Sequence, residues 1–386
     1  MNLSRHLQTQ LSDHFQIYKQ ALVLLGARQV GKTTLLKRIF PNADYLLLDN
    51  EETKRILDTY DINTYKQVLT ANRQLIIDEL HLLSDPGRAV KIIYDQIENI
   101  QIIVTGSSAL HIKNKSSESL AGRKIEYCLF PLTFSEYLVQ KEIEATLNFN
   151  VLDNVLNQKK QSMRLFSPRK LLSSVLLYGQ YPETLSLSSP QKYLEELADS
   201  VLFKDILELN LIDNRSKAKE LLKLLAYQIG NLVNYSEIGQ KLSMDRRTVE
   251  RYIEIFEQSF IIKRIYPFFK KKRNELSKTP KIFFYDLGLR NALIGNFDEI
   301  NIRADAGAMF ENFIIIELLK AIEYQNLDYR INYWRKKSGA EVDIVLTNTK
   351  NIYAVEVKLS QGQTSQAFKK DYPEAKDWVV TSNNFY

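Results

Sequence analysis

The feature that most constrains this chain is a phosphate-binding loop, GARQVGKT, at residues 26–33. The apolar run 21–25 precedes the loop and a helix-forming stretch begins at Thr34, which is the strand–loop–helix order that the GxxxxGK[ST] pattern requires. The glycines let backbone N–H groups surround a phosphate, Lys32 supplies charge for the β- and γ-phosphates, and the Thr33 hydroxyl suits Mg²⁺. We therefore expect this loop to bind ATP and Mg²⁺. The expected nucleotide-binding residues are Gly26, Ala27, Arg28, Gln29, Val30, Gly31, Lys32, Thr33 and Thr34.

The composition indicates a folded protein of several domains. The chain has 386 residues, of which 45% are hydrophobic and 25% charged, and this length suggests about two or three domains. No apolar run approaches the roughly 18 residues of a membrane span, and no signal-peptide core is present. The single cysteine, Cys128, excludes an intramolecular disulfide and a Cys-rich zinc site. These observations predict a cytoplasmic protein without a membrane segment.

Positive charge is concentrated in one segment of the chain. The formal net charge is +6, and residues 241–281 contain twelve Lys and Arg against five Asp and Glu, a local +7, so the other 345 residues sum to −1. A segment of this kind suits a polyanion such as DNA. The alternative is a solvated helix face with its linker.

The stretch QLIIDE at 74–79 is an apolar strand that ends in two acids, which is the Walker B form. On a parallel strand next to the loop strand, Asp78 would reach the Mg²⁺ shell and Glu79 would act as general base toward the attacking water. The alternative is a structural strand with acids at its end. Further strand-like runs at 44–49 and 100–104 predict a doubly wound parallel sheet with the ligand at the C-terminal strand ends.

Several motifs in combination resemble a known family. The motifs that carry this likeness are GARQVGKTT, LIIDEL, VTGSS, SLAGRK, PLTFSEYL, YGQYPE and YDLGLRN. Essentially the whole chain is similar to a widespread prokaryotic AAA-like ATPase family that carries a C-terminal domain of unknown function. Two departures stand close to the nucleotide motifs. Ala27 replaces a proline that is usual in the family, and His81 replaces a glutamine.

The resemblance implies further roles around the nucleotide. In AAA-type ATPases a polar residue after the strand at 100–104 contacts the γ-phosphate and the attacking water. Ser107 is the first candidate for this role and Thr105 the second, although turn chemistry alone also explains the Gly-Ser-Ser sequence. Arg123, next to Gly122, is a candidate arginine finger toward the nucleotide of a neighbouring subunit, which would require a homo-oligomer. A surface arginine in a loop is the alternative.

The middle of the chain is predicted to form a helical lid or linker at 146–215 and a winged helix at 216–280. The residue pattern of 236–256 predicts a helix-turn-helix, with Ser243 or Asp245 as the cap of the second helix. An apolar stripe at helical spacing predicts the buried face of that helix: Val249, Tyr252, Ile253 and Phe256.

The polar face of the second helix is the predicted DNA contact. It presents Arg246, Arg247, Glu250 and Arg251, which a winged helix would place in the major groove and on the flanking phosphates. The basic residues that follow add to this expectation: Lys263, Arg264, Lys270, Lys271, Lys272 and Arg273. Packing or protein contact is the alternative, because interleaved acids would repel phosphates; these are Glu250, Glu254 and Glu257.

Residues 281–386 are predicted to form a further domain of one helix and several strands. An amphipathic helix is expected at 311–319, and strands are expected at 331–335, 341–346 and 352–358. A helix that carries Glu311 is followed by a strand that carries Asp343 and by a strand that ends in Glu356-Val357-Lys358, a Glu-x-Lys (ExK) element. This order indicates the PD-(D/E)XK nuclease-like fold, an α/β fold of the restriction-endonuclease kind.

The acids of this segment suggest a metal site. Period-two geometry places Glu356 and Lys358 on one strand face, and a paired strand brings Asp343 beside them. Together with Glu311 these carboxylates offer hard oxygen ligands for Mg²⁺, Glu341 would be an outer ligand, and Lys358 would polarise the hydrolytic water. Cleavage of DNA is a separate claim that the pattern leaves open. Alternating charges on an exposed strand are the simpler explanation of the ExK element alone.

The sequence thus predicts an α/β protein of four parts: an AAA-like P-loop core at 1–145, a helical lid at 146–215, a winged helix at 216–280 and a nuclease-like domain at 281–386. The leading hypothesis is an ATP-hydrolysing switch whose nucleotide state repositions the last two parts on DNA. The alternative is a signalling or scaffold ATPase whose C-terminal domain recognises a protein and whose acids and lysine are vestigial. A small-molecule kinase is a third class, for which no acceptor-site signature is present.

Overall fold

The computed structural model describes residues 3–69, 72–107, 120–157, 168–203, 212–269 and 279–386. These residues form two compact units. The P-loop unit contains Ser4–Pro131 and Gln258–Phe260, and the C-terminal unit contains Met1–Leu3, Leu132–Glu257 and Ile261–Tyr386. The first unit ends earlier than the predicted boundary after residue 145, and the three later predicted parts pack as one unit. No helix of the described chain has the length and apolar character needed to span a membrane.

The P-loop unit is built on a five-stranded parallel sheet of order β2-β3-β4-β1-β5. The strands are β1 (Ala21–Leu25), β2 (Asp44–Leu47), β3 (Gln74–Asp78), β4 (Gln101–Gly106) and β5 (Lys124–Cys128). The expectation that the Walker B strand β3 lies next to the loop strand β1 is wrong, because β4 lies between them. All residues of β4 after Gln101 are buried, which suits a central position in the sheet.

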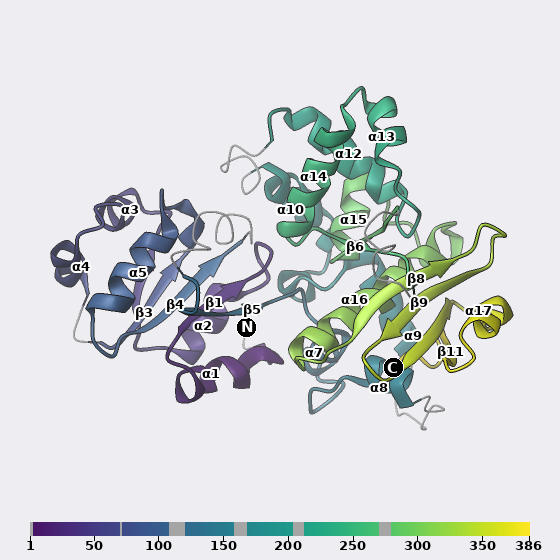
Figure 1. The fold of residues 1–386 in the computed structure, drawn as a ribbon, viewed down its shortest axis with the longest axis horizontal. Coiled ribbons are helices and arrows are strands. Elements are labelled where there is room, and N and C mark those ends of the chain that lie inside the picture. The colour runs from purple at the N-terminus through teal and green to yellow at the C-terminus, as the bar shows by residue number, and fades with distance from the viewer. Residues whose placement is uncertain (1–2, 70–71, 108–119, 158–167, 204–211, 270–278) are drawn as a thin grey trace. The chain divides into compact units, whose positions relative to one another are not determined.

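Helices cover both faces of this sheet. They are α1 (Leu7–Ile17), α2 (Lys32–Ile39), α3 (Glu51–Leu57), α4 (Ile62–Val68) and α5 (Pro86–Gln96), with a 3₁₀ turn η1 (Leu80–Leu82). The chain crosses from β1 to the far edge strand β2 and then steps back through β3 to β4, so right-handed crossovers place α2 on one face and α5 on the other (Figure 1). All strands therefore end at the same edge, where α2 begins.

The C-terminal unit starts with helices and a small ribbon. The helices are α7 (Phe134–Gln140), α8 (Asn150–Asn157), α9 (Pro168–Tyr178), α10 (Pro190–Phe203), α12 (Arg215–Tyr227), α13 (Tyr235–Leu242), α14 (Arg246–Gln258) and α15 (Leu287–Ile294), with 3₁₀ turns η2 (Pro182–Leu185) and η4 (Ile300–Ile302). Strands β6 (Ile262–Ile265) and β7 (Lys281–Phe284) pair antiparallel after α14.

The predicted helix-turn-helix is present as α13 and α14. Asp245 Oδ1 accepts a 2.8 Å bond from the backbone N–H of Arg247, as expected of the cap, and Ser243 instead takes the left-handed conformation at the end of α13. The predicted apolar stripe of α14 is buried: Val249, Tyr252, Ile253 and Phe256. A two-stranded ribbon follows these helices, as in a winged helix, and the winged-helix assignment itself stays a prediction.

The C-terminal part of this unit is a mixed sheet of order β11-β10-β9-β8. Its strands are β8 (Arg330–Arg335), β9 (Glu341–Thr347), β10 (Ile352–Lys358) and β11 (Lys376–Thr381), and its helices are α16 (Ala306–Tyr324) and α17 (Gln366–Asp371). The three predicted strands are confirmed within a residue. The expectation that the helix around Glu311 is amphipathic is wrong: α16 is buried on nearly all sides, because it contacts β10 as well as α8, α9 and α15.

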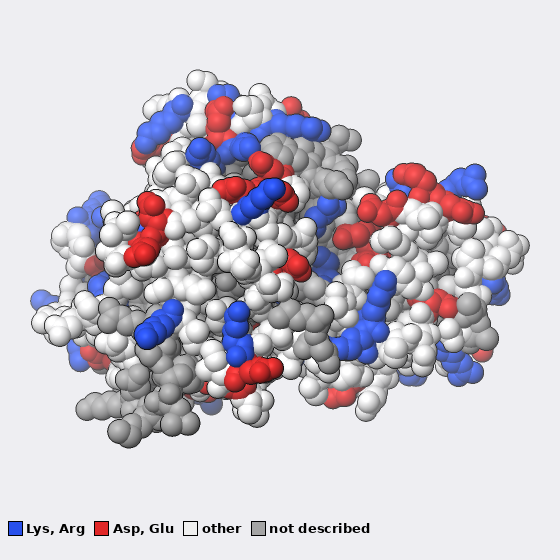
Figure 2. Space-filling view, turned by 180° about the vertical axis from the view of Figure 1, so that it is seen from behind, with Lys and Arg blue, Asp and Glu red and all other residues white. Residues whose placement is uncertain are grey.

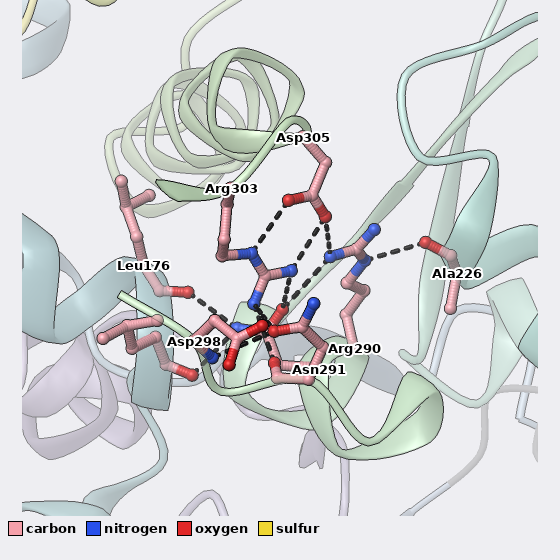
Figure 3. Close-up of polar contacts among 9 residues, drawn as sticks. Leu176, Ala226, Arg290, Asn291, Asp298, Arg303 and Asp305 are labelled. Carbon is pink, nitrogen blue, oxygen red and sulfur yellow. Dashed lines mark hydrogen bonds and ion pairs between the residues drawn. The ribbon is translucent and has the colours of Figure 1, made fainter. Parts of the chain in front are cut away.

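A buried polar cluster joins four elements of the C-terminal unit (Figure 3). Arg290 of α15 donates to the carbonyl oxygen of Ala226 in α12 and to Asp305, which precedes α16. Arg303 donates to both oxygens of Asp305, and Asn291 donates to carbonyl oxygens at the end of α9, including that of Leu176. Burial raises the pKa of Asp305, but the hydrogen bonds from the two arginines outweigh burial and lower it to about 2.

Candidate nucleotide site and acid–lysine cluster

The phosphate-binding loop has the backbone that its sequence predicts. At Gly26 a Cβ atom would lie 2.1 Å from the carbonyl oxygen of Leu129, so no larger residue fits there. Gly31 has φ +94°, in the left-handed region, and directly precedes α2. Lys32 is buried, and its Nζ donates to the carbonyl oxygens of Gly26 at 2.8 Å and Ala27 at 3.0 Å. The predicted strand, loop and helix are therefore confirmed, with the lysine held against the loop.

The Walker B aspartate is the centre of a hydroxyl network. Asp78 Oδ2 accepts from Thr33 Oγ1 at 2.7 Å and from the Tyr45 hydroxyl at 2.5 Å. Thr105 Oγ1 donates to Asp78 Oδ1. Burial and the bond to Asp78 raise the pKa of Tyr45. The loop helix, β2, β3 and β4 thus each contribute one side chain to this point at the C-terminal edge of the sheet.

Glu79 follows in a strained backbone position. Its φ is +60°, which is uncommon for a residue with a side chain. Its backbone N–H donates to Thr105 Oγ1 at 3.0 Å, and its Oε2 lies 3.3 Å from Nδ1 of buried His81. Burial raises the pKa of Glu79 while nearby Lys32 lowers it, with a net rise. A carboxylate with a raised pKa is a better general base at neutral pH.

The two candidate polar residues after β4 differ in their contacts. Thr105 Oγ1 donates to the carboxylate of Asp78 and accepts from the backbone N–H of Glu79. Ser107 is 1% exposed, and among the described residues its hydroxyl has no hydrogen-bond partner. The residues that follow, 108–119, lie outside the described part of the chain, as does the first residue of the SLAGRK motif, Ser119. The preference for Ser107 over Thr105 stays a prediction, although Thr105 is the residue that contacts the acids here.

Arg123 lies at the opposite edge of the sheet. It directly precedes β5, and its carbonyl oxygen accepts from Ala21 at the start of β1, whereas the P-loop follows the end of β1. Its guanidinium makes two hydrogen bonds to Asp95, with Nε–Oδ1 at 3.0 Å and Nη2–Oδ2 at 3.2 Å. Arg123 is therefore remote from the loop of its own chain, and a role as arginine finger, which stays a prediction, requires a second subunit.

Sequence reasoning missed two residues of this site. Arg5 is 4% exposed, and it donates to the carbonyl oxygen of Val30 in the loop at 2.8 Å and to that of Phe130 at 2.6 Å. Tyr45 contacts Asp78 as described above. No spacing relates either residue to the motifs, because both contacts depend on chain segments brought together only by folding.

The donors around Asp78 fit a magnesium ion. Thr33 Oγ1 and Asp78 Oδ2 are hard oxygen atoms 2.7 Å apart at the N-terminus of α2, and hydroxyl and carboxylate oxygens are the donors that Mg²⁺ prefers. Lys32 and the loop amides lie beside them for phosphate. The predicted pair Thr33 and Asp78 therefore meets in the folded chain.

The C-terminal motif also assembles, but as ion pairs. Asp343 Oδ2 accepts from Nζ of Lys358 at 2.7 Å and from the backbone N–H of Val357 at 2.8 Å. Lys358 Nζ lies 3.2 Å from Glu356 Oε2. The predicted strand geometry is correct, since Asp343, Glu356 and Lys358 come together from β9 and β10.

A second lysine, which the sequence did not indicate, serves the other two acids. Lys281 of β7 is 4% exposed, and its Nζ lies 3.1 Å from Glu311 Oε1 and 2.7 Å from Glu341 Oε1. Burial raises the pKa of Glu311 to about 7 and that of Glu356 to about 7, in both cases helped by nearby Asp343. We call these four acids and two lysines the acid–lysine cluster.

The acid–lysine cluster does not fit the predicted metal site. Within the described residues no group of three or more His, Cys, Asp or Glu side chains is placed to hold a metal ion. The expected metal ligands Glu311, Asp343 and Glu356 are therefore corrected to ion-pair partners. Each of these three carboxylates has one oxygen within 3.2 Å of the ammonium group of Lys281 or Lys358.

The predicted DNA-contacting face of α14 is exposed, whereas the basic residues that follow it are described only in part and are half-buried where described. Arg246, Arg247 and Glu250 are exposed on α14, and Arg251 pairs with Asp213. Arg264 and Lys263 instead lie against Glu257, at 2.5 Å and 3.4 Å, and residues 270–278 lie outside the described chain. On the face shown in Figure 2, Lys and Arg side chains are interleaved with Asp and Glu rather than gathered into one patch.

Three family models match the chain. Residues 18–138 match a model described as an AAA domain, which supports an AAA-like P-loop ATPase domain there. Residues 169–300 match a domain of unknown function, DUF8612, and residues 306–384 match another, DUF4143. The predicted C-terminal domain of unknown function is thereby confirmed, while its nuclease-like nature stays a prediction.

Curated relatives extend over most of the chain. An uncharacterized protein of Methanocaldococcus jannaschii is 27% identical over 379 residues, covering 91% of this chain and 78% of the relative. An uncharacterized protein of Haemophilus influenzae is 25% identical, covering 87% and 81%. The same order of segments thus occurs in an archaeon and a bacterium.

Solved structures with some likeness include one named as a Walker-type ATPase and one with AMPPCP bound. The Walker-type ATPase PABY2304 of Pyrococcus abyssi has a TM-score of 0.46 and 15% identity, covering 74% of this chain and 94% of its own. AMPPCP-bound DnaA of Aquifex aeolicus has a TM-score of 0.33 and 14% identity, covering 65% and 86%. Because both scores are below 0.5, the fold assignment rests on the sheet order and the loop geometry described above.

Proposed function

We propose that the P-loop unit binds ATP with Mg²⁺ and hydrolyses it. The observation that carries the proposal is the meeting of Thr33, Asp78 and Thr105 at the C-terminal edge of the sheet, beside the loop lysine and Glu79. Bound Mg²⁺ would supply charge neutralisation on the phosphates. The chain itself supplies loop amides and Lys32 for phosphate binding, and Glu79 to accept a proton from water.

Two substitutions test this proposal. Lys32→Ala should abolish ATP binding, and Glu79→Gln should retain binding while slowing hydrolysis by about 10²–10⁴-fold. Lys19→Ala and Glu98→Gln are matched controls, because both residues are exposed and lie before β1 and β4, at the opposite sheet edge. Binding is measured with a fluorescent ATP analogue, and hydrolysis by phosphate release. Turnover that survives both site substitutions contradicts the proposal.

Contact of α14 with DNA is proposed as a second function, on a separate observation. Arg246 and Arg247 are exposed and occupy the first turn of α14, where the helix dipole disfavours cations by about 0.3–1 kcal/mol each. Two arginines at this position weaken the helix, so their presence favours an anionic partner. In helix-turn-helix proteins this end of the second helix contacts DNA.

Salt dependence tests the DNA proposal. Affinity for a duplex should fall steeply with salt, and the joint substitution Arg246→Ala, Arg247→Ala should reduce the slope by about two charges. Lys217→Ala, in the neighbouring helix α12, is the control for loss of a surface cation. Binding that is absent, or that does not depend on salt, would instead favour a protein partner.

For the C-terminal domain, the contacts favour the scaffold alternative over a metal-dependent nuclease. Each of the four acids is within 3.2 Å of a lysine ammonium group. We propose that the domain acts through binding and conformation rather than through cleavage. Incubation of linear, branched and single-stranded DNA with the protein and Mg²⁺ or Mn²⁺ tests this proposal, and cutting that Lys358→Ala removes would overturn it.

A further inference from the structure

One oxygen of the Walker B aspartate receives two hydroxyl donors from two different elements. Thr33 Oγ1 of α2 lies 2.7 Å from Asp78 Oδ2, and the Tyr45 hydroxyl of β2 lies 2.5 Å from the same atom. The other oxygen, Oδ1, accepts from Thr105 of β4. The carboxylate orientation is therefore fixed from three sides, and Tyr45 is the contributor that no nucleotide motif contains.

The register of the sheet explains why a tyrosine is needed. Strands β2 and β3 are parallel, and Leu47 is the residue paired with Asp78. Tyr45 lies two positions earlier, on the same face as Leu47, so its backbone is offset from Asp78 by about 6.6 Å along the strand. A tyrosine side chain spans this offset and ends in a donor. Serine or threonine at position 45 would be too short, and phenylalanine would fill the space without donating.

The Tyr45 ring is held in place independently of its hydroxyl. Nζ of Lys37, one turn along α2 from Thr33, lies 3.8 Å from the centre of the ring, within the range of a cation–π contact. The ring is thus fixed between the loop helix and the edge of the sheet. This contact does not depend on the hydroxyl, so a phenylalanine at position 45 is expected to keep the same position.

We propose that Tyr45 is a positioning residue for Asp78, and that its hydroxyl sets the affinity of the nucleotide site for Mg²⁺. The inference rests on the proposed ATPase function and deepens it. When Asp78 Oδ2 is held toward Thr33, the carboxylate and hydroxyl oxygens lie together as ligands for Mg²⁺. Without the hydrogen bond from the Tyr45 hydroxyl, Asp78 is free to take other rotamers. The Asp78 carboxylate and the Thr33 hydroxyl then lie together for a smaller fraction of the time.

The test compares Tyr45→Phe with Tyr65→Phe in the full chain. Tyr65 is a buried tyrosine of the same unit whose hydroxyl donates to the carbonyl oxygen of Leu57 at 2.5 Å, so its substitution also removes one buried hydrogen bond. For Tyr45→Phe, the Mg²⁺ concentration that gives half-maximal hydrolysis should rise about tenfold, the typical effect of losing one hydrogen bond to a charged group. The rate at saturating Mg²⁺ should stay within about twofold of the wild-type rate.

A second readout does not depend on turnover. Mn²⁺ titrated with ADP should raise the melting temperature of wild-type protein at about tenfold lower concentration than for Tyr45→Phe. ADP affinity without metal should be equal in the two proteins. Equal metal dependence of wild type and Tyr45→Phe, or an equal shift in Tyr65→Phe, overturns the inference. Absence of hydrolysis in the wild type overturns the ATPase proposal instead, while the Mn²⁺ titration still decides the role of Tyr45.

Discussion

The P-loop unit and the C-terminal unit each gather carboxylates, but they treat the charge differently. Around Asp78 the donors are hydroxyl groups, from Thr33, Tyr45 and Thr105, which orient the carboxylate and leave its negative charge in place. In the acid–lysine cluster the donors are ammonium groups, which cancel charge. The comparison teaches that the type of donor, rather than the number of acids, decides whether a site can take an external cation.

The largest expected effect is on stability in the C-terminal unit. Lys281→Met should lower the free energy of unfolding by about 3–5 kcal/mol, because it removes a buried ammonium group that half-buried Glu311 and Glu341 share as counter-ion. Lys358→Met, at a position whose side chain is 41% exposed, should cost much less. Urea unfolding followed by circular dichroism measures both. Equal losses would break the distinction between a buried and a half-exposed lysine.

The corresponding change at the nucleotide site should affect function instead. Asp78→Asn should weaken Mg²⁺-dependent nucleotide binding by about 100-fold, because it removes the charge while keeping the shape. Its effect on the free energy of unfolding should be about 1 kcal/mol or less, since hydroxyl partners accept an amide without leaving a buried charge. A large stability loss on this substitution would mean that the two sites are not different in kind.

The pH dependence of stability should also separate the sites. The folded pKa values of Glu311 and Glu356 are raised to about 7, so the native state holds protons that the unfolded state has lost. Stability from these protons is complete below about pH 4.5 and is lost as the pH rises through about 7, by on the order of 3 kcal/mol for Glu311 alone. Glu311→Gln should flatten this fall between pH 5 and 8 in urea unfolding. An unchanged slope would contradict the assignment.

The smallest effect is expected at the exposed pair Arg123–Asp95. Arg123→Ala should change the free energy of unfolding by less than about 1 kcal/mol, as is usual for surface ion pairs. If Arg123 acts on the nucleotide of a second subunit, ATPase activity per chain should rise with protein concentration, and the substitution should remove that rise. Activity that is independent of concentration in both proteins would remove the arginine-finger role.

The sequence predicted the local parts of both sites and missed the long-range parts. Residues 26–33 and 74–79 were correctly placed because strand, loop and helix are encoded by neighbouring residues. The insertion of β4 between β1 and β3 was not predicted, since strand order depends on pairing between distant segments. For the same reason Tyr45, Arg5 and Lys281 were missed: their partners lie in other elements.

The error at α16 has a physical signal that was present in the sequence. The run FIIIELL at 313–319 places apolar residues on every side of a helix, which is typical of a helix buried all round rather than of an amphipathic one. Two acids of α16, Glu311 and Glu317, are tolerated because Lys281 and Lys320 pair with them. Charged residues within an otherwise apolar helix therefore indicated buried ion pairs, not a solvent-facing side.

The cluster around Asp305 has a consequence for how the C-terminal unit comes apart. One carboxylate pairs with both Arg290 and Arg303, and the side chains around it also bind the ends of α9 and α12. Releasing any one of these helices leaves a buried arginine or carbonyl group without its partner, so partial opening is costly. Amide protons of α9, α12 and α15 are therefore expected to exchange together, as one cooperative unit in which no helix frays alone.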